Sequence, residues 1–478
     1  MKKSKYFLLL LLFVPVLFFV GCNEKTKAKN FYEIDAKYSE SEQTLSCNQK
    51  TTYHNNSENA LSFVSFFLYP NAFLKENNAV SSSYKERAYP NGESYGNITF
   101  QKIQIENCDC EYTFGENKNV VRVNLKEKLF PTEQVCIEFD YVVSLANINH
   151  RLGYGENCVN FGGFFPIACV YENGFVENQF ANNGDPFYSE TADFEVKITY
   201  PNDFVLASSG VQTKFEDHTL CKAENVRDFC FVLSKDFSVI QKEIDGVEIN
   251  YFFYDDEKAE KHLETAAKAV TDFSQMFGDY PYKQLSVVKT GFCFGGMEYP
   301  NLVMISDDAR EDFVDYVIVH EIAHQWWYSL VGNNEFSESF VDESLTEYST
   351  LLFFEKENQY GLSYDSLVEN AAESYKNFVK IYTKIQGSVD QRMDRNLLEF
   401  NTEPEYVHCV YTKGVLMYDC LRQILKDKTF FRCLKNYFND YKFKIAKREN
   451  LIESFSKSSN RNLKPFFDSW LDGKVVVE

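Results

Sequence analysis

The sequence has little positive charge and few histidines for its length. Its 478 residues include 49 Lys and Arg against 70 Asp and Glu, for a formal net charge of −21, and only seven His. This acidic balance argues against nucleic acid as a partner, because phosphate binding needs clustered Lys and Arg. No internal repeat and no low-complexity tract stands out. Because His is scarce, a motif that contains two of them is hard to ascribe to chance.

The overall composition excludes a chain that is disordered throughout. Hydrophobic residues make up 44% and charged residues 25%, which is close to ordinary globular proteins. Aromatic residues make up 17%, which is ample material for large cores. At ~100–200 residues per domain, the length allows two to four domains.

The N-terminal hydrophobic run is short. Lysines at positions 2, 3 and 5 precede an apolar run over 6–20. A membrane span needs ~20 apolar residues, so this pattern predicts a secretory signal over 1–21. Phe19-Val-Gly-Cys22 resembles a bacterial lipobox, in which Cys22 would be lipidated, although Phe19 stands where Leu is usual. A plain secretory signal and an N-terminal anchor helix are the alternatives.

A lipidated Cys22 would tether the protein to a membrane. We therefore predict a lipid-anchored tether over 22–40, whose composition is polar, and a position at the bacterial cell surface or periplasmic face. Twelve further cysteines follow at scattered spacings. An exported protein permits disulfides, but we expect most of these cysteines to be free thiols.

The periodicity of the chain changes at about residue 245. Residues 41–245 alternate with period two, as in Val135-Cys-Ile137-Glu-Phe139 and Phe194-Glu-Val196, and predict an antiparallel β-sandwich-like domain. Residues 246–478 begin with a helical pattern over 256–277, continue with short strands over 284–293 and 301–306, and are then mainly helical. The predicted fold class is therefore multidomain α+β, with two domains.

The second half contains His320-Glu321-Ile-Ala-His324. On an α-helix, residues i and i+4 lie on the same face, so both imidazoles can reach one metal ion. Glu321 lies beside them, where a carboxylate can take a proton from a metal-activated water. The alternative is two solvated helix histidines. The apolar residues around the motif, including Trp326 and Trp327, instead indicate a buried helix, where unpartnered imidazoles would be costly.

A catalytic zinc usually has three protein ligands. Glu343 lies 19 positions after His324, which leaves room for a turn near Gly332 and a second helix that returns antiparallel. It is the candidate third ligand. Glu347 follows one helical turn later, where it could orient a zinc-bound imidazole or be a solvated carboxylate.

These residues resemble the M1 family of zinc aminopeptidases, the gluzincins. Gly295-Gly296-Met-Glu298-Tyr299 is similar to the family's Gly-x-Met-Glu-Asn motif, and Tyr411-Thr-Lys413-Gly is similar to its Tyr-x-Lys-Gly motif. The segment 277–281 resembles the entry to the family's catalytic domain. In the β half the resemblance is weaker and depends on residues 184–190. The resemblance implies a thermolysin-like catalytic domain with one zinc ion.

The resemblance also assigns roles, each of which has a simpler alternative. Glu298 would hold the free α-amino group of a peptide, with Gly295 and Gly296 along its backbone; the alternative is a glutamate in a surface turn. Tyr411 would hydrogen-bond the oxyanion of the transition state; the alternative is a buried core tyrosine. His320, His324 and Glu343 would be the zinc ligands, and Glu321 the general base.

The chain departs from the family pattern at several points. Tyr299 replaces Asn, and Ser344 replaces the Gly after the zinc glutamate. A β-domain motif that ends in Phe-Asp-Glu-Pro is absent, so the residue that some relatives supply from that domain to the amine site cannot be placed. The sequence stops where many relatives continue into a large C-terminal helical domain, from which we expect a more open cleft.

The predicted function is zinc-dependent hydrolysis of N-terminal residues from peptides. The predicted partners are peptides with a free N-terminus and, through the lipid anchor, a membrane. One alternative is a zinc endopeptidase whose open cleft admits internal bonds. Another is a catalytically silent peptide-binding surface lipoprotein, against which the presence of both Glu321 and Tyr411 counts.

Overall fold

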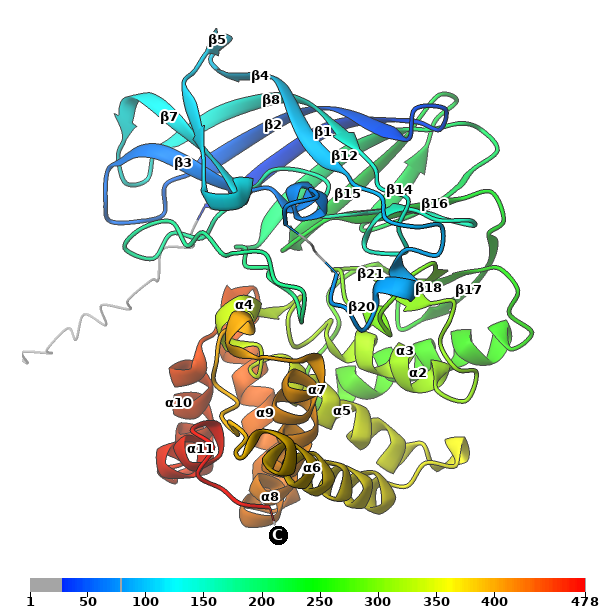
Figure 1. The fold of residues 1–478 in the computed structure, drawn as a ribbon, viewed down its shortest axis with the longest axis vertical. Helices are drawn as coiled ribbons and strands as arrows, with labels where there is room; N and C mark the ends of the chain where they lie inside the picture. The colour runs from blue at the N-terminus through cyan, green and yellow to red at the C-terminus, as the bar shows by residue number, and fades with distance from the viewer. Residues whose placement is uncertain (1–27, 78–79, 478) are drawn as a thin grey trace, which may run out of the picture.

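A computed structural model describes residues 28–77 and 80–477. A first half rich in β-sheet lies at one end of the molecule and a helical region lies at the other, with a small sheet between them (Figure 1). This arrangement confirms the predicted α+β fold class. The predicted signal over 1–21 and Cys22 lie outside the described residues.

The first half is built from three sheets. The largest is mostly antiparallel and has the strand order β14 (Val211–Lys214), β15 (Thr219–Val226), β12 (Ala192–Thr199), β1 (Asn30–Ser39), β2 (Thr44–His54), β8 (Gln134–Ser144), β4 (Asn97–Ile105) and β5 (Cys108–Asp109). Two four-stranded sheets accompany it: β13 (Val205–Ser208), β16 (Cys230–Ser234), β10 (Val159–Gly162) and β9 (Leu152–Tyr154); and β11 (Ile167–Ala168), β3 (Leu61–Phe67), β7 (Val120–Leu129) and β6 (Tyr112–Phe114).

Part of the predicted tether is a central strand. The prediction of a spacer over 22–40 does not hold for residues 30–39, which form β1 between β2 and β12. Its pairing with β12 is parallel, whereas its pairing with β2 is antiparallel. The physical reason is the period-two pattern of Tyr32, Ile34, Ala36 and Tyr38, all of which are buried.

A five-stranded mixed sheet opens the second half. Its order is β17 (Ser238–Ile244), β18 (Val247–Phe253), β19 (Gln284–Thr290), β21 (Leu302–Ser306) and β20 (Gly296–Met297). The three central strands are parallel and the two edge strands are antiparallel to their neighbours. β17 precedes the predicted boundary at residue 246, yet it pairs along its whole length with β18, so the sheet of the second half begins at Ser238.

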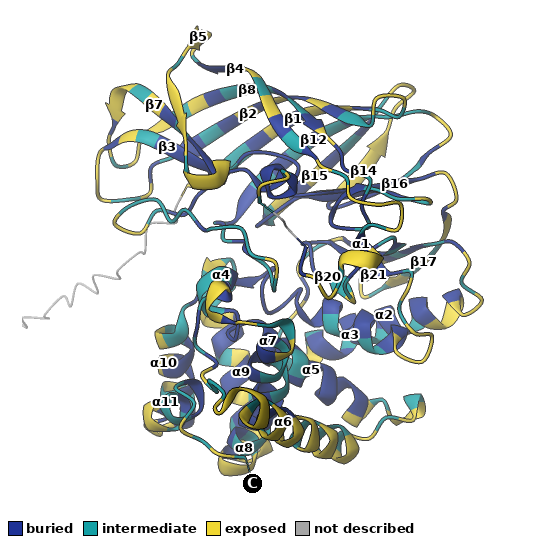
Figure 2. Ribbon diagram, in the orientation of Figure 1, coloured by how far each residue is buried: buried dark blue, intermediate teal, exposed yellow. Residues whose placement is uncertain are grey.

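Helices make up most of the remaining chain. They are α2 (Ala259–Met276), α3 (Val314–Ala323), α4 (Glu335–Glu338), α5 (Glu343–Lys356), α6 (Tyr364–Gln386), α7 (Glu403–Val407), α8 (Lys413–Leu425), α9 (Asp427–Tyr441), α10 (Arg448–Ser459) and α11 (Lys464–Leu471), while the short α1 (Lys85–Ala88) belongs to the first half. α5 is almost entirely buried, whereas α6 exposes its outer face (Figure 2). α5 therefore lies at the centre of the helical region.

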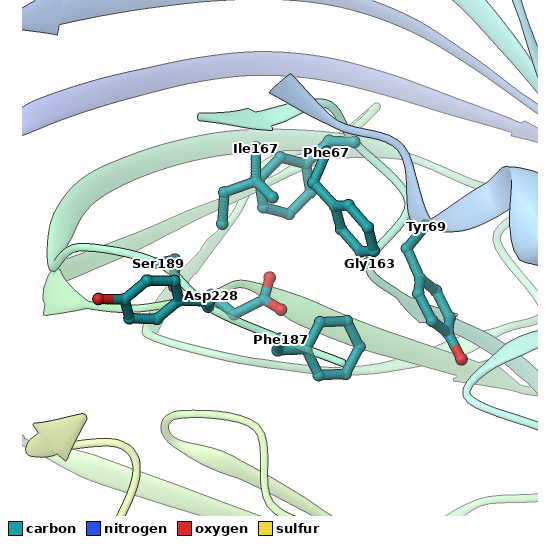
Figure 3. Close-up of a pocket in the computed structure, with 9 residues that line it drawn as sticks. Phe67, Tyr69, Gly163, Ile167, Phe187, Ser189 and Asp228 are labelled. Atoms are coloured by element: carbon teal, nitrogen blue, oxygen red, sulfur yellow. The ribbon is translucent and has the colours of Figure 1, made fainter. Parts of the chain in front are cut away.

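A small pocket in the first half contains a buried carboxyl group. The Asp228 side chain is directed among the aromatic and aliphatic groups of Phe187, Ile167 and Phe67 (Figure 3). One of its oxygens accepts a hydrogen bond of 2.7 Å from the backbone N–H of Phe229. Burial raises the pKa of this carboxyl to about 7, although that hydrogen bond and the charge of Arg151 act to lower it.

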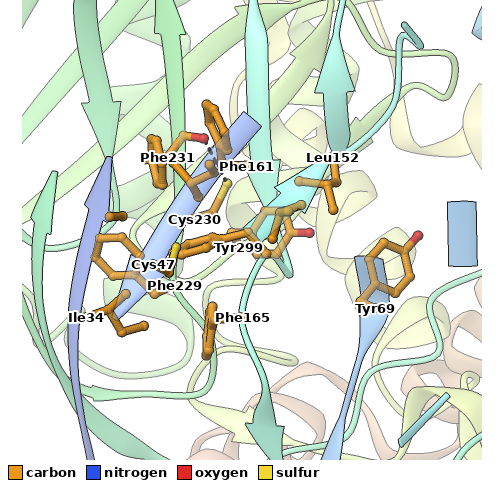
Figure 4. Packing of buried hydrophobic residues seen from close by; sticks show 14 of the residues in the cluster. Ile34, Cys47, Tyr69, Leu152, Phe161, Phe165, Phe229, Cys230, Phe231 and Tyr299 are labelled. Atoms are coloured by element: carbon orange, nitrogen blue, oxygen red, sulfur yellow. Dashed lines mark hydrogen bonds between the residues drawn. The ribbon is translucent and has the colours of Figure 1, made fainter. Parts of the chain in front are cut away.

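Tyr299 connects the two halves. It follows β20 but packs into the hydrophobic core of the first half, beside Phe229 and Leu152 (Figure 4). A Cβ atom at Gly162 of β10 would overlap the Tyr299 ring, so the close approach depends on glycine there. The tyrosine that replaces the family's asparagine is therefore a buried contact between the halves.

The twelve cysteines in the described residues are all free, as expected. Within residues 28–77 and 80–477, no helix has the length and apolar character that crossing a membrane requires.

Candidate active site

Two neighbouring helices bring the three predicted metal ligands together. His320 lies on α3, His324 directly follows its last residue, and Glu343 is the first residue of α5. The Nε2 atoms of the two imidazoles are 3.3 Å apart, and Glu343 Oε2 lies 3.1 Å from His324 Nε2 and 3.5 Å from His320 Nε2. The second helix, α5, thus returns antiparallel to the first helix, α3, as predicted.

α3 is a short helix of 10 residues. It ends at Ala323, and the next turns tighten, since Gln325 and Trp326 bond back three residues rather than four. This ending still leaves His320 and His324 one helical turn apart. Their side chains therefore share one face.

Each imidazole is oriented through its other ring nitrogen. His320 Nδ1 lies 2.8 Å from Glu347 Oε2, and His324 Nδ1 lies 3.0 Å from the carbonyl oxygen of Trp327. A carboxylate and a carbonyl only accept, so both Nδ1 atoms carry a proton, and both Nε2 atoms face Glu343. Glu347 is itself fixed by the Tyr316 hydroxyl, which donates to it at 2.7 Å.

The donor set fits a zinc ion. One ligand atom each from His320, His324 and Glu343 lies within 4.8 Å of the other two. Burial alone would raise the pKa of Glu343, but the charges and hydrogen bonds of the two histidines outweigh it and hold that pKa well below its ordinary value. Two imidazoles and one ionised carboxylate, with a carboxylate behind His320, are the ligands typical of catalytic zinc sites.

Glu321, the residue after His320 on α3, has its carboxylate against Gly296 of β20. A Cβ atom at Gly296 would overlap the Glu321 carboxylate, so this glycine makes room for it. Glu321 Oε2 is buried and has no hydrogen-bond partner in the described part of the chain. Burial raises the pKa of Glu321 to about 7, which suits a group that must accept and release a proton near neutral pH.

Glu298 lies beyond the glycine pair on the same loop. Its side chain is only 3% exposed, and burial raises its pKa well above the ordinary range. A Cβ atom at Gly295 would make only an ordinary van der Waals contact with Val317, at 3.9 Å. Glu298 is thus a buried carboxylate on the wall of the cavity, and not a glutamate in a surface turn.

Tyr411 lies in a single π-helical turn, His408–Thr412. Such turns are frequent at functional sites because they redirect one side chain. The Tyr411 hydroxyl donates a hydrogen bond to Glu343 Oε1, and its ring stacks on His320 at 5.9 Å between centroids. Burial and the Glu343 charge raise its pKa well above the usual value, so the hydroxyl stays protonated.

The site also contains one residue of the β half that the sequence did not reveal. Asp185, in the loop between β11 and β12, has an oxygen within 4.8 Å of oxygens of both Glu298 and Glu343. Its other contact is an ion pair with the buried Arg151. The segment 184–190 carried a family resemblance, but spacing alone could not show that Asp185 lies opposite Glu298.

These residues line one cavity of about 360 Å³ between the two halves. Tyr84, Arg151 and Asp185 come from the first half, and the zinc-ligand candidates, Glu321, Glu298, Gly295, Gly296 and Tyr411 come from the second. All the predicted site residues except Cys22 are therefore brought together. Lys413 is separate, because its Nζ donates to the carbonyl oxygens of Gln391 and Trp470 at 2.8 and 3.2 Å.

Comparisons with known proteins give the same picture for the second half. Residues 261–470 match the family model described as "Peptidase family M1 domain". The chain is 21% identical over 407 residues to an aminopeptidase N of Lactobacillus delbrueckii subsp. lactis, covering 78% of this chain and 46% of the relative. It is 27% identical over 222 residues to an aminopeptidase B of Mus musculus, covering 41% of this chain and 32% of the relative. The chain thus spans about half the length, or less, of these curated relatives.

Solved structures show the likeness of the fold over nearly the whole chain. An M1 zinc metallopeptidase from Deinococcus radiodurans matches with a TM-score of 0.67 at 15% identity, covering 94% of this chain and 96% of that chain. A mutant of the Deinococcus enzyme bound to a Tyr-Ser-Ala substrate matches with a TM-score of 0.63 at 17% identity, covering 94% of each chain. The two-part architecture is therefore a known one.

Proposed function

Residues 261–470 match the peptidase family M1 domain, and from that premise we propose that the protein is a zinc-dependent aminopeptidase. It would remove N-terminal residues from peptides. The observation that carries the proposal is the convergence of His320, His324 and Glu343 with Glu321 and Glu298 on one cavity.

His320, His324 and Glu343 would hold the zinc ion. When bound, zinc polarises the scissile carbonyl and lowers the pKa of water. Glu347 and the Trp327 carbonyl fix the two imidazoles so that their Nε2 atoms face the ion. The family implies one zinc, and the three donors make one complete set.

Glu321 moves the proton. Its carboxylate takes a proton from the attacking water and then delivers it to the amine that leaves as the peptide bond breaks. A pKa of about 7 allows both steps near neutral pH, and Gly296 leaves space beside the carboxylate. Tyr411 donates from its hydroxyl to the oxygen on which negative charge develops, and releases Glu343 Oε1 to do so.

Glu298 and Asp185 determine which peptides bind. Both carboxylates border the cavity, and a free α-ammonium group placed between them would be bound by two charge-assisted hydrogen bonds. A blocked or internal residue lacks that charge and leaves the carboxylates unpaired. This feature favours an aminopeptidase over an endopeptidase that uses the same metal centre.

The direct test uses aminoacyl-arylamide substrates with and without a chelator. We expect release of the arylamine by the zinc-loaded chain, loss of that activity on chelation, and recovery when zinc is restored. A zinc-loaded chain without such activity, but with bound peptide, would instead support the silent peptide-binding lipoprotein.

We also propose that Cys22 is lipidated and holds the protein at the bacterial surface. The support is the sequence alone: a basic start, an apolar run over 6–20 and the lipobox-like Phe19-Val-Gly-Cys22. Intact mass spectrometry of the chain from a bacterial membrane should give a chain that starts at Cys22 and carries acyl mass. A Cys22→Ser variant should remain unacylated. A wild-type chain without acyl mass would refute the proposal.

A further inference from the structure

The substrate cavity extends along α7, away from the zinc-ligand candidates. Glu403 is the first residue of this helix, and Val407 and Tyr411 follow at intervals of four residues. All three residues line the cavity, so they lie along one side of this helical segment. At a rise of about 1.5 Å per residue, Glu403 lies roughly 12 Å along the segment from Tyr411, which bonds to Glu343. The cavity therefore continues well beyond the reacting groups.

Two aromatic side chains border this end of the cavity. The Tyr84 hydroxyl, from the first half, donates a hydrogen bond to Glu403 Oε1. The Tyr84 ring meets the Phe294 ring edge-on, with 4.6 Å between the ring centroids. Phe294 directly precedes Gly295 and lines the cavity, as Tyr84 does. Glu403, Tyr84 and Phe294 thus form one continuous wall, which we call the outer wall.

The outer wall lies beside the proposed amine site. Phe294 is four residues before Glu298 on the same loop, and both residues line the cavity. The Arg151 guanidinium, whose partner is Asp185, lies 6.0 Å from the Phe294 ring centroid. Both carboxylates of the amine site are thus linked to Phe294, one along the chain and one through Arg151. The side chain of an N-terminal residue branches from the carbon that carries the α-ammonium group, so a long side chain can reach the outer wall.

The charge of the cavity favours a cationic side chain there. Six carboxylates line it: Asp185, Glu298, Glu321, Glu343, Glu347 and Glu403. Among the described residues that line the cavity, Arg151 is the only arginine and there is no lysine. Arg151 already pairs with Asp185. One zinc ion and one arginine therefore offset only part of the negative charge of the cavity.

Glu403 has no cationic partner in the described part of the chain. The only hydrogen bond of its side chain there comes from the Tyr84 hydroxyl, and no Lys, Arg or His nitrogen lies within 4.0 Å of the carboxylate. Glu347, by comparison, is bonded to His320. Burial and the bond to Glu403 raise the pKa of the Tyr84 hydroxyl, so this hydroxyl remains the donor. Glu403 Oε2 is therefore available to accept a hydrogen bond from a ligand.

We propose that this cavity selects peptides whose N-terminal residue is Lys or Arg, with Glu403 as the acceptor for the cationic end of that side chain. This selection rests on the proposed aminopeptidase activity, in which Glu298 and Asp185 hold the α-ammonium group. The methylene stem of the lysine or arginine packs on the rings of Tyr84 and Phe294, and its charged end reaches Glu403. A short side chain leaves Glu403 without contact, and a long neutral one leaves its charge unpaired.

Steady-state kinetics of the zinc-loaded full chain on lysyl- and norleucyl-arylamides tests the proposal, because norleucine has the lysine stem without the ammonium group. We expect kcat/KM to be at least about tenfold higher for the lysyl substrate, with a similar preference for an arginyl substrate. Glu403→Gln keeps the shape of the side chain but removes its charge, so the lysyl-to-norleucyl ratio should fall by about tenfold. Glu373→Gln removes an exposed acid on α6 outside the cavity; it is the matched control and should keep the wild-type ratio.

Tyr84→Phe separates charge from structure, because it removes the hydrogen bond between the two halves and leaves the Glu403 charge in place. This variant should keep the preference for the lysyl substrate. The proposal is overturned if the wild type cleaves the lysyl and norleucyl substrates equally well, if Glu403→Gln keeps the wild-type ratio, or if Tyr84→Phe lowers the ratio as far as Glu403→Gln does. Cleavage without a charge preference would leave the aminopeptidase activity standing, whereas a zinc-loaded chain that cleaves none of the three substrates would overturn both.

Discussion

Replacing Tyr411 with Phe should reduce turnover strongly without releasing zinc. The change removes one hydroxyl group and retains the ring that stacks on His320. In the structure that hydroxyl is bonded to Glu343 Oε1, while the oxygen that faces the imidazoles is Oε2. The zinc-ligand geometry therefore does not depend on the hydroxyl.

The expected size of the effect follows from the number of donors lost. A single pre-organised donor to a developing oxyanion is worth about 10²–10³ in kcat, or about 2.7–4 kcal/mol. Burial and Glu343 keep the Tyr411 pKa well above its ordinary value, so the wild-type hydroxyl is a donor throughout the usual assay range. Glu298 and Asp185 are untouched, so KM should change little.

Steady-state kinetics on an aminoacyl-arylamide, together with zinc content, measures this prediction. Tyr406→Phe is the matched control, because its ring meets Tyr411 edge-on at 5.6 Å and borders the same cavity, but its hydroxyl has no hydrogen-bond partner in the described residues. We expect this control to stay close to wild-type kcat. A Tyr411→Phe enzyme with wild-type kcat and full zinc would refute the role of the hydroxyl.

Three further substitutions test other parts of the site and fold. Glu321→Gln should keep zinc and lose at least about 10²–10⁴ in kcat, and retained turnover would rule out its role as the base. Glu347→Gln should weaken zinc binding by about 10–100-fold in a chelator titration, because His320 Nδ1 loses its carboxylate; unchanged affinity would show that Glu347 does not support the ligand. The pKa of the Asp228 carboxyl is about 7 in the folded protein and about 4 in the unfolded chain. As pH rises between these values, the unfolded chain loses this proton first, so the free energy of unfolding falls. Asp228→Asn should therefore stabilise the protein by up to about 4 kcal/mol at pH 8 and by little near pH 4, as measured by urea unfolding; an equal gain at both pH values would contradict the ionisation argument.

The sequence predictions that the structure confirms depend on local patterns of residues. The period-two strands of the first half and the helical pattern of α2 depend on short-range burial, and both elements form where expected. The convergence of His320, His324 and Glu343 follows from helix geometry and a loop of suitable length.

Contacts between distant segments account for what the sequence left open. Asp185 faces Glu298 only because the β half packs over the loop after β20, and no spacing within either segment encodes that contact. The sequence predicts a polar spacer over residues 30–39 because the outward face of strand β1 carries charged residues. These charges make the alternating buried positions of the strand difficult to recognise in the sequence.

The central claim is that a free α-amino group directs cleavage. The most direct test compares one peptide with its N-acetylated twin, both incubated with the zinc-loaded chain and followed by mass spectrometry. The account predicts stepwise removal of residues from the free N-terminus and no cleavage of the acetylated peptide, because Glu298 and Asp185 then face no positive charge. Cleavage of the acetylated peptide at internal bonds, at a rate comparable to the free one, would contradict it.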